Sequence, residues 1–168
     1  FRNHKSLELN FDFDKINVFF GSNGIGKTNI LEAIYMLAIT KSFRGNLIKE
    51  SIQYDKSYFR IFGNITANDC ESKLETSYQD SPTKRVLKKN GISTVFKKYF
   101  GNLLISFFSP DELNLIYLEP SRRRKYLNTV LSQIYPEYLE ALIKYEKVLI
   151  QRNKLLNMIK ENKASKLD

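Results

Sequence analysis

A glycine-rich segment near the start of the chain holds the residue types that bind phosphate. In GSNGIGKT, residues 21–28, Gly21, Gly26, Lys27 and Thr28 occupy the fixed positions of the pattern G-x-x-x-x-G-K-[ST]. The glycines let the backbone curl closely enough for its amide groups to contact phosphate oxygens. We expect Lys27 to lie against the outer phosphates and the Thr28 hydroxyl to bind Mg²⁺. We call residues 21–28 the glycine-rich loop, and its pattern predicts a nucleotide site.

The sequence predicts a strand before this loop and a helix after it. INVFF, residues 16–20, is nearly continuous apolar sequence, which favours a central buried strand. TNILEAIYMLAI, residues 28–39, has apolar residues at helical spacing. This order brings the loop amides and the positive end of the helix together at the phosphates. Before it, LELNFDF, residues 7–13, alternates apolar and polar residues, which predicts a half-buried antiparallel edge strand.

The middle of the chain has mainly strand patterns, and the end has helix patterns. Strands are expected at residues 58–65 and 73–78, within residues 85–100 and at residues 102–108, with a hairpin turn at Asn90-Gly91. Pro120 and Pro136 each suit the first turn of a helix, the second of about 25 residues with apolar residues at 4-3 spacing. That stripe is explained by packing within a helical lobe or by a coiled-coil partner. The predicted fold is α/β, with a mixed sheet on the helix after the loop in residues 1–110 and the start of an all-helical lobe in residues 111–168.

Composition excludes several classes of protein. The single cysteine, Cys70, cannot form an internal disulfide or a zinc site, and His4 is the only histidine, expected to be solvated. The sequence has neither a signal-peptide pattern nor an apolar run of the roughly 20 residues that span a membrane. We therefore expect a cytoplasmic protein without a membrane segment. Because the chain opens at Phe1, we also expect it to be part of a longer protein.

The positive charge is concentrated in the second part of the chain. The net charge is +9, and residues 81–125 hold ten Lys or Arg against three acids. Such a concentration suggests a polyanionic partner, usually nucleic acid, although a lysine-rich solvated surface explains it equally well. The candidate DNA-binding residues form a hairpin group and a group at a helix start, where positive charge opposes the helix dipole. They are Lys84, Arg85, Lys88, Lys89, Lys97 and Lys98, and Arg122, Arg123 and Arg124.

Beyond the loop, four segments resemble the RecF family. They are FRN at residues 1–3, FSPDEL at residues 108–113 with PSRRR at residues 120–124, and QRNKLL at residues 151–156. The resemblance covers essentially the whole chain and corresponds to the N-terminal half of the family. It implies a cytoplasmic ABC-type ATPase related to SMC heads, which dimerises around ATP on DNA at single-strand to double-strand junctions. It also implies partnership with RecR and RecO in gap repair, recombination, replication restart and the SOS response to DNA damage.

The resemblance also assigns roles to particular residues. It places ATP and Mg²⁺ against Gly21, Asn23, Gly24, Gly26, Lys27, Thr28 and Asn29 of the loop, with Arg2 as a second nucleotide contact. Residues 109–112 fall where ABC ATPases carry the loop that senses the γ-phosphate, but the usual glutamine is missing. Phe43 stands where the family often has histidine, so no role that depends on that histidine is expected here.

The expected activity is limited by the motifs that this stretch lacks. The family's signature motif and Walker B acids lie in its C-terminal half, so residues 1–168 supply half of a composite site. We expect weak ATPase activity of the whole protein and no meaningful hydrolysis by these residues alone. The alternatives are another SMC-like or ABC-type chromosome-associated head, or a P-loop kinase that acts on a small acceptor.

Overall fold

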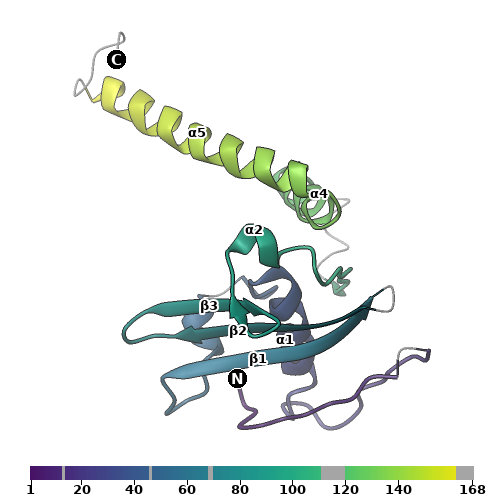
Figure 1. Ribbon diagram of the computed structural model, residues 1–168. Coiled ribbons are helices and arrows are strands. Elements are labelled where there is room, and N and C mark those ends of the chain that lie inside the picture. Colours follow the sequence, from purple (N-terminus) through teal and green to yellow (C-terminus); the bar gives the residue numbers. More distant parts are fainter. Residues whose placement is uncertain (13, 46, 68–69, 111–119, 162–168) are drawn as a thin grey trace. The chain divides into compact units, whose positions relative to one another are not determined.

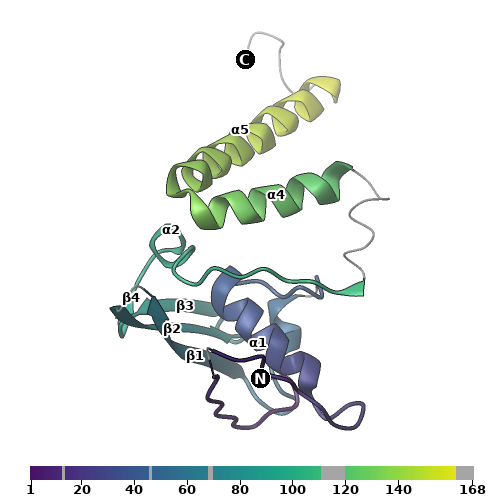
Figure 2. The same cartoon turned by 90° about the vertical axis from the view of Figure 1, so that its right-hand side faces the viewer.

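The computed structural model describes residues 1–12, 14–45, 47–67, 70–110 and 120–161. The chain divides into two compact units, Phe1–Phe107 and Phe108–Asp168. Figures 1 and 2 show strands and short helices in the first unit and two long helices in the second. None of the described helices combines the length and apolar character needed to cross a membrane.

The first unit is built on a four-stranded antiparallel sheet. Its strands are β1 (Tyr58–Ala67), β2 (Cys70–Gln79), β3 (Lys84–Lys89) and β4 (Ile92–Ser93), in the order β1-β2-β3-β4 (Figure 2). In the register of the sheet, Phe62 pairs with Glu75, and Glu75 pairs with Lys88. Because side chains alternate along each strand, these three lie on one face and their sequence neighbours on the other.

Helix α1 (Lys27–Ile39) packs on β1 and β2 and supplies part of the core (Figure 2). Leu37, Leu74, Leu87 and Tyr99 form a buried apolar cluster between the helix, the sheet and the short helix α2 (Phe96–Tyr99). The hydroxyl of Tyr99 donates to the carbonyl oxygen of Leu37 at 2.8 Å, so the buried phenol keeps a partner. A Cβ on Gly63 would meet Leu37 at 3.0 Å, so glycine permits this close approach of helix and strand. The predicted α/β class, with a sheet packed on the helix after the loop, is confirmed, although the sheet formed by the described strands is antiparallel rather than mixed.

The hairpin between β3 and β4 confirms the turn predicted at Asn90-Gly91. Both residues have positive φ, 52° and 79°, as a two-residue turn of type I′ requires. The returning strand is much shorter than expected, because β4 ends at Ser93 and the chain enters α2 at Phe96. Lys97 and Lys98 therefore lie on a helical turn rather than on a strand. The helical turn of α2 places Tyr99, which is 1% exposed, in the core.

Three predicted strands are wrong, because they do not form among the described residues. Residues 7–12 and 16–20 have no strand pairing, and residues 102–108 are also irregular. Ile16 and Phe20 are each 91% exposed, although the sequence predicted a central buried strand there. Phe11 and Phe19 still meet edge to face, with ring centroids 6.2 Å apart. An apolar segment becomes a strand only where a partner backbone accepts its ladder of hydrogen bonds, and periodicity does not reveal that partner.

The second unit contains helices α4 (Pro120–Ile134) and α5 (Pro136–Lys160), which contact each other. Pro136 lies in the first turn of α5, and the 25 residues of that helix match the predicted length. The hydroxyl of Tyr138 donates to the side-chain oxygen of Asn128 at 2.6 Å and so ties the two helices together. Two apolar residues of the predicted 4-3 stripe are exposed, Tyr145 at 63% and Leu156 at 46%, and the other four are partly buried. The residues Asp111 and Glu112 of the expected γ-phosphate segment lie outside the described residues.

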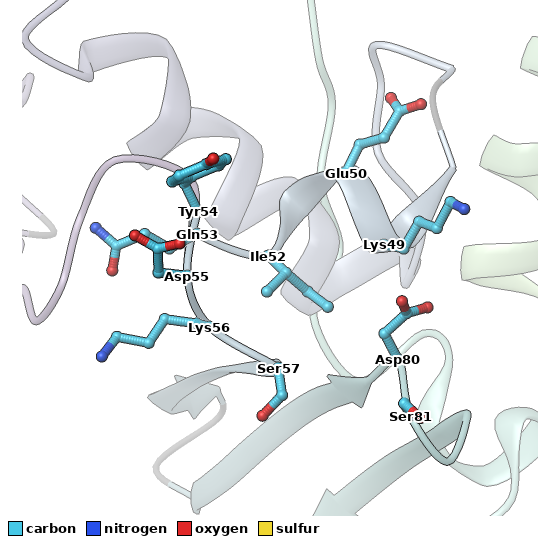
Figure 3. Close-up of a pocket in the computed structure, with 10 residues that line it drawn as sticks. All are labelled: Lys49, Glu50, Ile52, Gln53, Tyr54, Asp55, Lys56, Ser57, Asp80 and Ser81. Atoms are coloured by element: carbon cyan, nitrogen blue, oxygen red, sulfur yellow. The ribbon is translucent and has the colours of Figure 1, made fainter.

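One further short helix, η1 (Ile48–Ser51), contributes Lys49 and Glu50 to a hollow of about 530 Å³. Residues 52–57, Asp80 and Ser81 form the rest of its lining. Figure 3 shows that the side chains of Tyr54, Asp55 and Lys56 point away from Ile52 and Asp80. None of the glycine-rich loop residues lines this hollow, and its charged groups are not gathered toward a common point. It therefore offers no arrangement for catalysis.

Candidate phosphate-binding site

The glycine-rich loop leads directly into α1 through residues in the left-handed region of backbone conformation. Gly24 has φ of 85° and Gly26 has φ of 111°, values that side-chain-bearing residues rarely adopt. Gly26 is the N-cap of α1, and no side chain caps the helix there. The first-turn amides of α1 therefore begin where the loop ends, which is the arrangement that binds anions at helix starts.

Lys27 lies across the loop rather than away from it. Its Nζ donates to the carbonyl oxygens of Gly21 at 2.6 Å and Ser22 at 2.9 Å. The ammonium is thus held over the mouth of the loop, within reach of an anion bound to the loop amides. Asn23 and Thr28 are exposed, with Thr28 in the first turn of α1. These positions fit the predicted contacts with a triphosphate and its Mg²⁺, which remain predictions.

The N-terminal residues pack against the underside of the loop, a contact that the sequence did not predict. Asn3 Nδ2 donates to the carbonyl oxygens of Ile25 at 3.0 Å and Gly24 at 3.4 Å. His4, with its proton on Nε2, donates to the carbonyl oxygen of Gly26 at 3.2 Å. The expectation of a solvated His4 is therefore wrong, because the ring is half-buried against the loop.

A buried carboxylate on α1 lies next to this contact. Glu32 is fully buried and binds Arg2 through two hydrogen bonds, of 3.0 and 2.5 Å. Arg44 lies 3.4 Å from the same carboxylate, and the Ser42 hydroxyl donates to it at 2.6 Å. Burying a carboxylate is costly unless it is paired, and here it has two cations and a hydroxyl. We call Glu32 with Arg2, Ser42 and Arg44 the Glu32 cluster. Glu32 is the only charged residue within residues 30–39 of α1, and this was the signal that could have revealed the cluster.

The predicted nucleotide contacts Arg2 and Asn29 already have protein partners. Besides Glu32, the guanidinium of Arg2 donates to the carbonyl oxygen of Glu50 at 2.8 Å. Asn29 Nδ2 donates to Asn3 Oδ1 at 2.8 Å, and Asn29 Oδ1 accepts from Arg44 at 2.9 Å. The structure therefore joins both residues to the support of the loop, and a direct contact with nucleotide remains a prediction for each.

Phe43, which stands at the family's frequent histidine position, serves as a packing residue. Its ring stacks on that of Phe107, with centroids 4.3 Å apart and planes 20° apart. Tyr35 meets both rings edge to face. This aromatic cluster holds the segment after α1, which carries Ser42 and Arg44, next to the helix.

The structure does not bring the predicted hairpin cations to one surface. Lys84 and Lys88 lie on the sheet face opposite α1, whereas Arg85 and Lys89 share the face of the buried Leu87. Arg85 donates to the carbonyl oxygen of Thr40 at the end of α1, and burial lowers the pKa of its guanidinium. Lys89 is bonded to Asn102, and Lys97 and Lys98 are on α2. In the second unit, Arg122, Arg123 and Arg124 are exposed in the first turns of α4.

Comparison with known proteins agrees with the geometry of the loop. The model of the AAA ATPase domain matches residues 1–167. The chain belongs to the AAA ATPase domain family. It is also 39% identical to the DNA replication and repair protein RecF of Thermoanaerobacter sp. (strain X514) over 99% of its length, and 39% identical to RecF of Bacillus mycoides (strain KBAB4) over 96%.

A solved structure gives the same match. The chain is 38% identical to the protein described as "recombination mediator protein RecF-ATP in RecFOR pathway", with a TM-score of 0.89 over 99% of this chain and 44% of that one. The RecF resemblance predicted from the sequence motifs is confirmed. The chain spans about half the length of the relatives that it matches, 46% of the Thermoanaerobacter protein and 43% of the Bacillus protein.

Proposed function

We propose that this chain is the nucleotide-binding part of a RecF-type, ATP-dependent DNA-binding recombination mediator. The observation that carries the proposal is the glycine-rich loop, with Lys27 held over it at the start of α1. Relatives at 39% identity are named for DNA replication and repair, and one solved relative is described with ATP. Together these support a protein that acts on DNA under the control of ATP.

In this proposal, different residues of the site contact different parts of the nucleotide. The amides of the loop and the first turn of α1 bind the β- and γ-phosphates, and Lys27 neutralises their charge. Thr28 would supply a hydroxyl ligand to Mg²⁺, which would neutralise part of the phosphate charge. Gly21, Asn23, Gly24 and Gly26 shape the loop around the phosphates. Catalysis in this class depends on positioning and charge neutralisation. In the proposed function, ATP acts as a conformational switch.

The nucleotide controls contact with DNA in the proposed cycle. ATP closes a homodimer on DNA at a single-strand to double-strand junction, and hydrolysis releases it, with RecR and RecO as partners in gap repair and replication restart in the cytoplasm. Among the candidate cations, Lys84 and the arginines of α4 are the better placed for phosphate contacts. Lys88 already pairs with Glu75 and Arg85 already donates to the carbonyl oxygen of Thr40, which disfavours both as DNA contacts.

The test is the affinity of the intact protein for a gapped DNA duplex, measured with and without Mg-ATP. We expect tighter binding with Mg-ATP in the wild type and no such gain in Lys27→Ala, because the loop then lacks its cation. Lys49→Ala, an exposed lysine away from the loop, is the matched control and should behave as the wild type. Equal DNA affinity in all conditions, or phosphoryl transfer to a small acceptor, would contradict the proposal.

The DNA surface is tested separately by charge. Replacing Arg122 and Arg124 with glutamine should weaken DNA binding and reduce its dependence on salt. Each lost phosphate contact lowers the number of counterions that are released when the protein binds DNA. The same measurement on Lys84→Gln with Lys88→Gln tests the sheet face. If either double variant keeps the DNA affinity and the salt slope of the wild type, the residues replaced in it are not part of the DNA-binding surface.

A further inference from the structure

The N-terminal residues Asn3 and His4 contact the glycine-rich loop through its carbonyl oxygens. Asn3 and His4 together donate to three successive carbonyl oxygens, those of Gly24, Ile25 and Gly26. A Cβ added to Gly26 would overlap the side chains of both residues, so they lie directly against its Cα. We call residues 2–4 the N-terminal brace.

Because the peptide unit is planar, these contacts to the carbonyl oxygens also determine where the loop N–H groups point. In a trans peptide unit the C=O and N–H groups point in opposite directions. Because the carbonyl oxygens of Ile25 and Gly26 are turned toward the brace, the N–H groups of Gly26 and Lys27 point away from it. Successive amides that face one side, with residues of positive φ among them, form a concave anion site.

The brace itself is held by the Glu32 cluster. Arg2 has a φ of 52°, an uncommon value for a residue with a side chain, and persists there because its guanidinium is bound to Glu32 and to the Glu50 carbonyl. Asn29 donates to Asn3 Oδ1, which leaves the amide group of Asn3 directed at the loop. Arg44 fixes Asn29 in turn. Each residue in this chain of contacts is therefore oriented by the next.

We propose that the N-terminal brace is a positioning device for the phosphate site. Asn3 holds the carbonyl groups of Gly24 and Ile25, and His4 supplements the backbone N–H groups of Asn29 and Ile30 at the carbonyl oxygen of Gly26. These contacts aim the loop amides at the phosphates of the nucleotide. The proposal rests on the proposed function, since it concerns the same nucleotide site. It assigns Arg2 and Asn29 a supporting role through Glu32 and Asn3, in place of direct contact with the nucleotide.

The experiment compares Mg-ATP affinity of the intact protein by isothermal titration calorimetry. Asn3→Ala and His4→Ala should each bind Mg-ATP roughly threefold to tenfold more weakly, the loss expected for one removed hydrogen bond. His4→Gln, which keeps an N–H donor, should bind more tightly than His4→Ala. Asn64→Ala removes the same side chain from an exposed position on β1 and should leave the affinity unchanged.

A second measurement separates positioning from general stability. Hydrogen–deuterium exchange without nucleotide should rise in residues 22–27 of Asn3→Ala and stay unchanged in β1 and β2. A rise throughout the first unit would overturn the proposal, because it would mean that the brace acts on the fold as a whole. Unchanged Mg-ATP affinity in both alanine variants, with Lys27→Ala deficient, would overturn the brace alone. Equally weak binding by the wild type and Lys27→Ala would overturn the proposed function and the brace with it.

Discussion

Two carboxylates of the first unit each bind two cations, but they do so in different surroundings. Glu32 lies on α1 and is fully buried, and its partner Arg2 is 13% exposed. Glu75 lies on β2 at 8% exposure, with Arg60 at 2.5 Å and half exposed and with Lys88 at 3.1 Å. Solvent therefore screens the charges around Glu75 and leaves those around Glu32 in a drier environment.

The two clusters also differ in what they connect. Glu75 and Lys88 are direct cross-strand neighbours, and Arg60 is two residues from the partner of Glu75 on β1, so the register of the sheet already brings them together. Arg2 and Glu32 are 30 residues apart and belong to segments that no sheet register joins. The Glu75 group strengthens a surface that backbone pairing has built. The Glu32 cluster instead attaches separate segments to the helix behind the glycine-rich loop.

The largest expected effect is that of Glu32→Ala. Removing this carboxylate leaves Arg2 and Arg44 without their shared partner in a buried place, which typically costs about 3–5 kcal/mol of the free energy of unfolding. Urea titration followed by circular dichroism measures it. Glu50→Ala, an exposed carboxylate nearby, is the control and should stay within about 0.5 kcal/mol of the wild type. A loss below about 1 kcal/mol for Glu32→Ala would remove the distinction between the clusters.

Arg44→Met should have a smaller effect on stability. Arg44 lies 3.4 Å from Glu32 with its side chain one-third exposed, and Arg2 remains to compensate the carboxylate. We expect a loss of about 1 kcal/mol, the usual contribution of one hydrogen-bonded contact. The same urea titration provides the measurement. A loss as large as that of Glu32→Ala would mean that Arg44, rather than Arg2, is the main partner of the carboxylate.

The Glu75 group predicts a dependence of stability on pH. Burial raises the pKa of Glu75, but the hydrogen bonds and charges of Arg60 and Lys88 outweigh it and hold the pKa below its ordinary value of 4.5. The paired carboxylate therefore adds stability above pH 4.5, and this part is lost as the pH falls through the lowered pKa. The difference in unfolding free energy between the wild type and Glu75→Gln should shrink between pH 6 and pH 3. A constant difference over that range would contradict the pairing.

The smallest expected effect is that of Lys88→Met. Its side chain is 34% exposed, and Arg60 continues to pair with Glu75, so the loss should stay below about 1 kcal/mol. The thermal unfolding midpoint in low and in high salt measures it, because salt screens an exposed pair and should narrow the gap to the wild type. A larger loss of stability that does not change with salt would mean that Lys88, like Arg2, forms a buried ion pair.

Local sequence patterns predicted the elements whose hydrogen bonds and turns are local. Helices α1, α4 and α5 followed from apolar spacing and from prolines at helix starts, and the Asn90-Gly91 turn from residues that tolerate positive φ. Strands β1 to β3 were also found, each adjacent in sequence to its partner. The strands expected at residues 7–13, 16–20 and 102–108 did not form among the described residues. Such strands need partner strands distant in the chain, and the alternation of apolar and polar residues does not identify those partners.

Residue types and their spacing were enough to predict the phosphate site. Gly21, Gly26, Lys27 and Thr28 predict an anion-binding loop before a helix, because the pattern is local in the chain. The support of the loop came from tertiary contacts. Asn3 and His4 contact it from 21 and 22 residues away in the chain, and the pair of Arg2 and Glu32 beside them spans 30 residues. Side-chain contacts across such separations depend on packing, which no local pattern encodes.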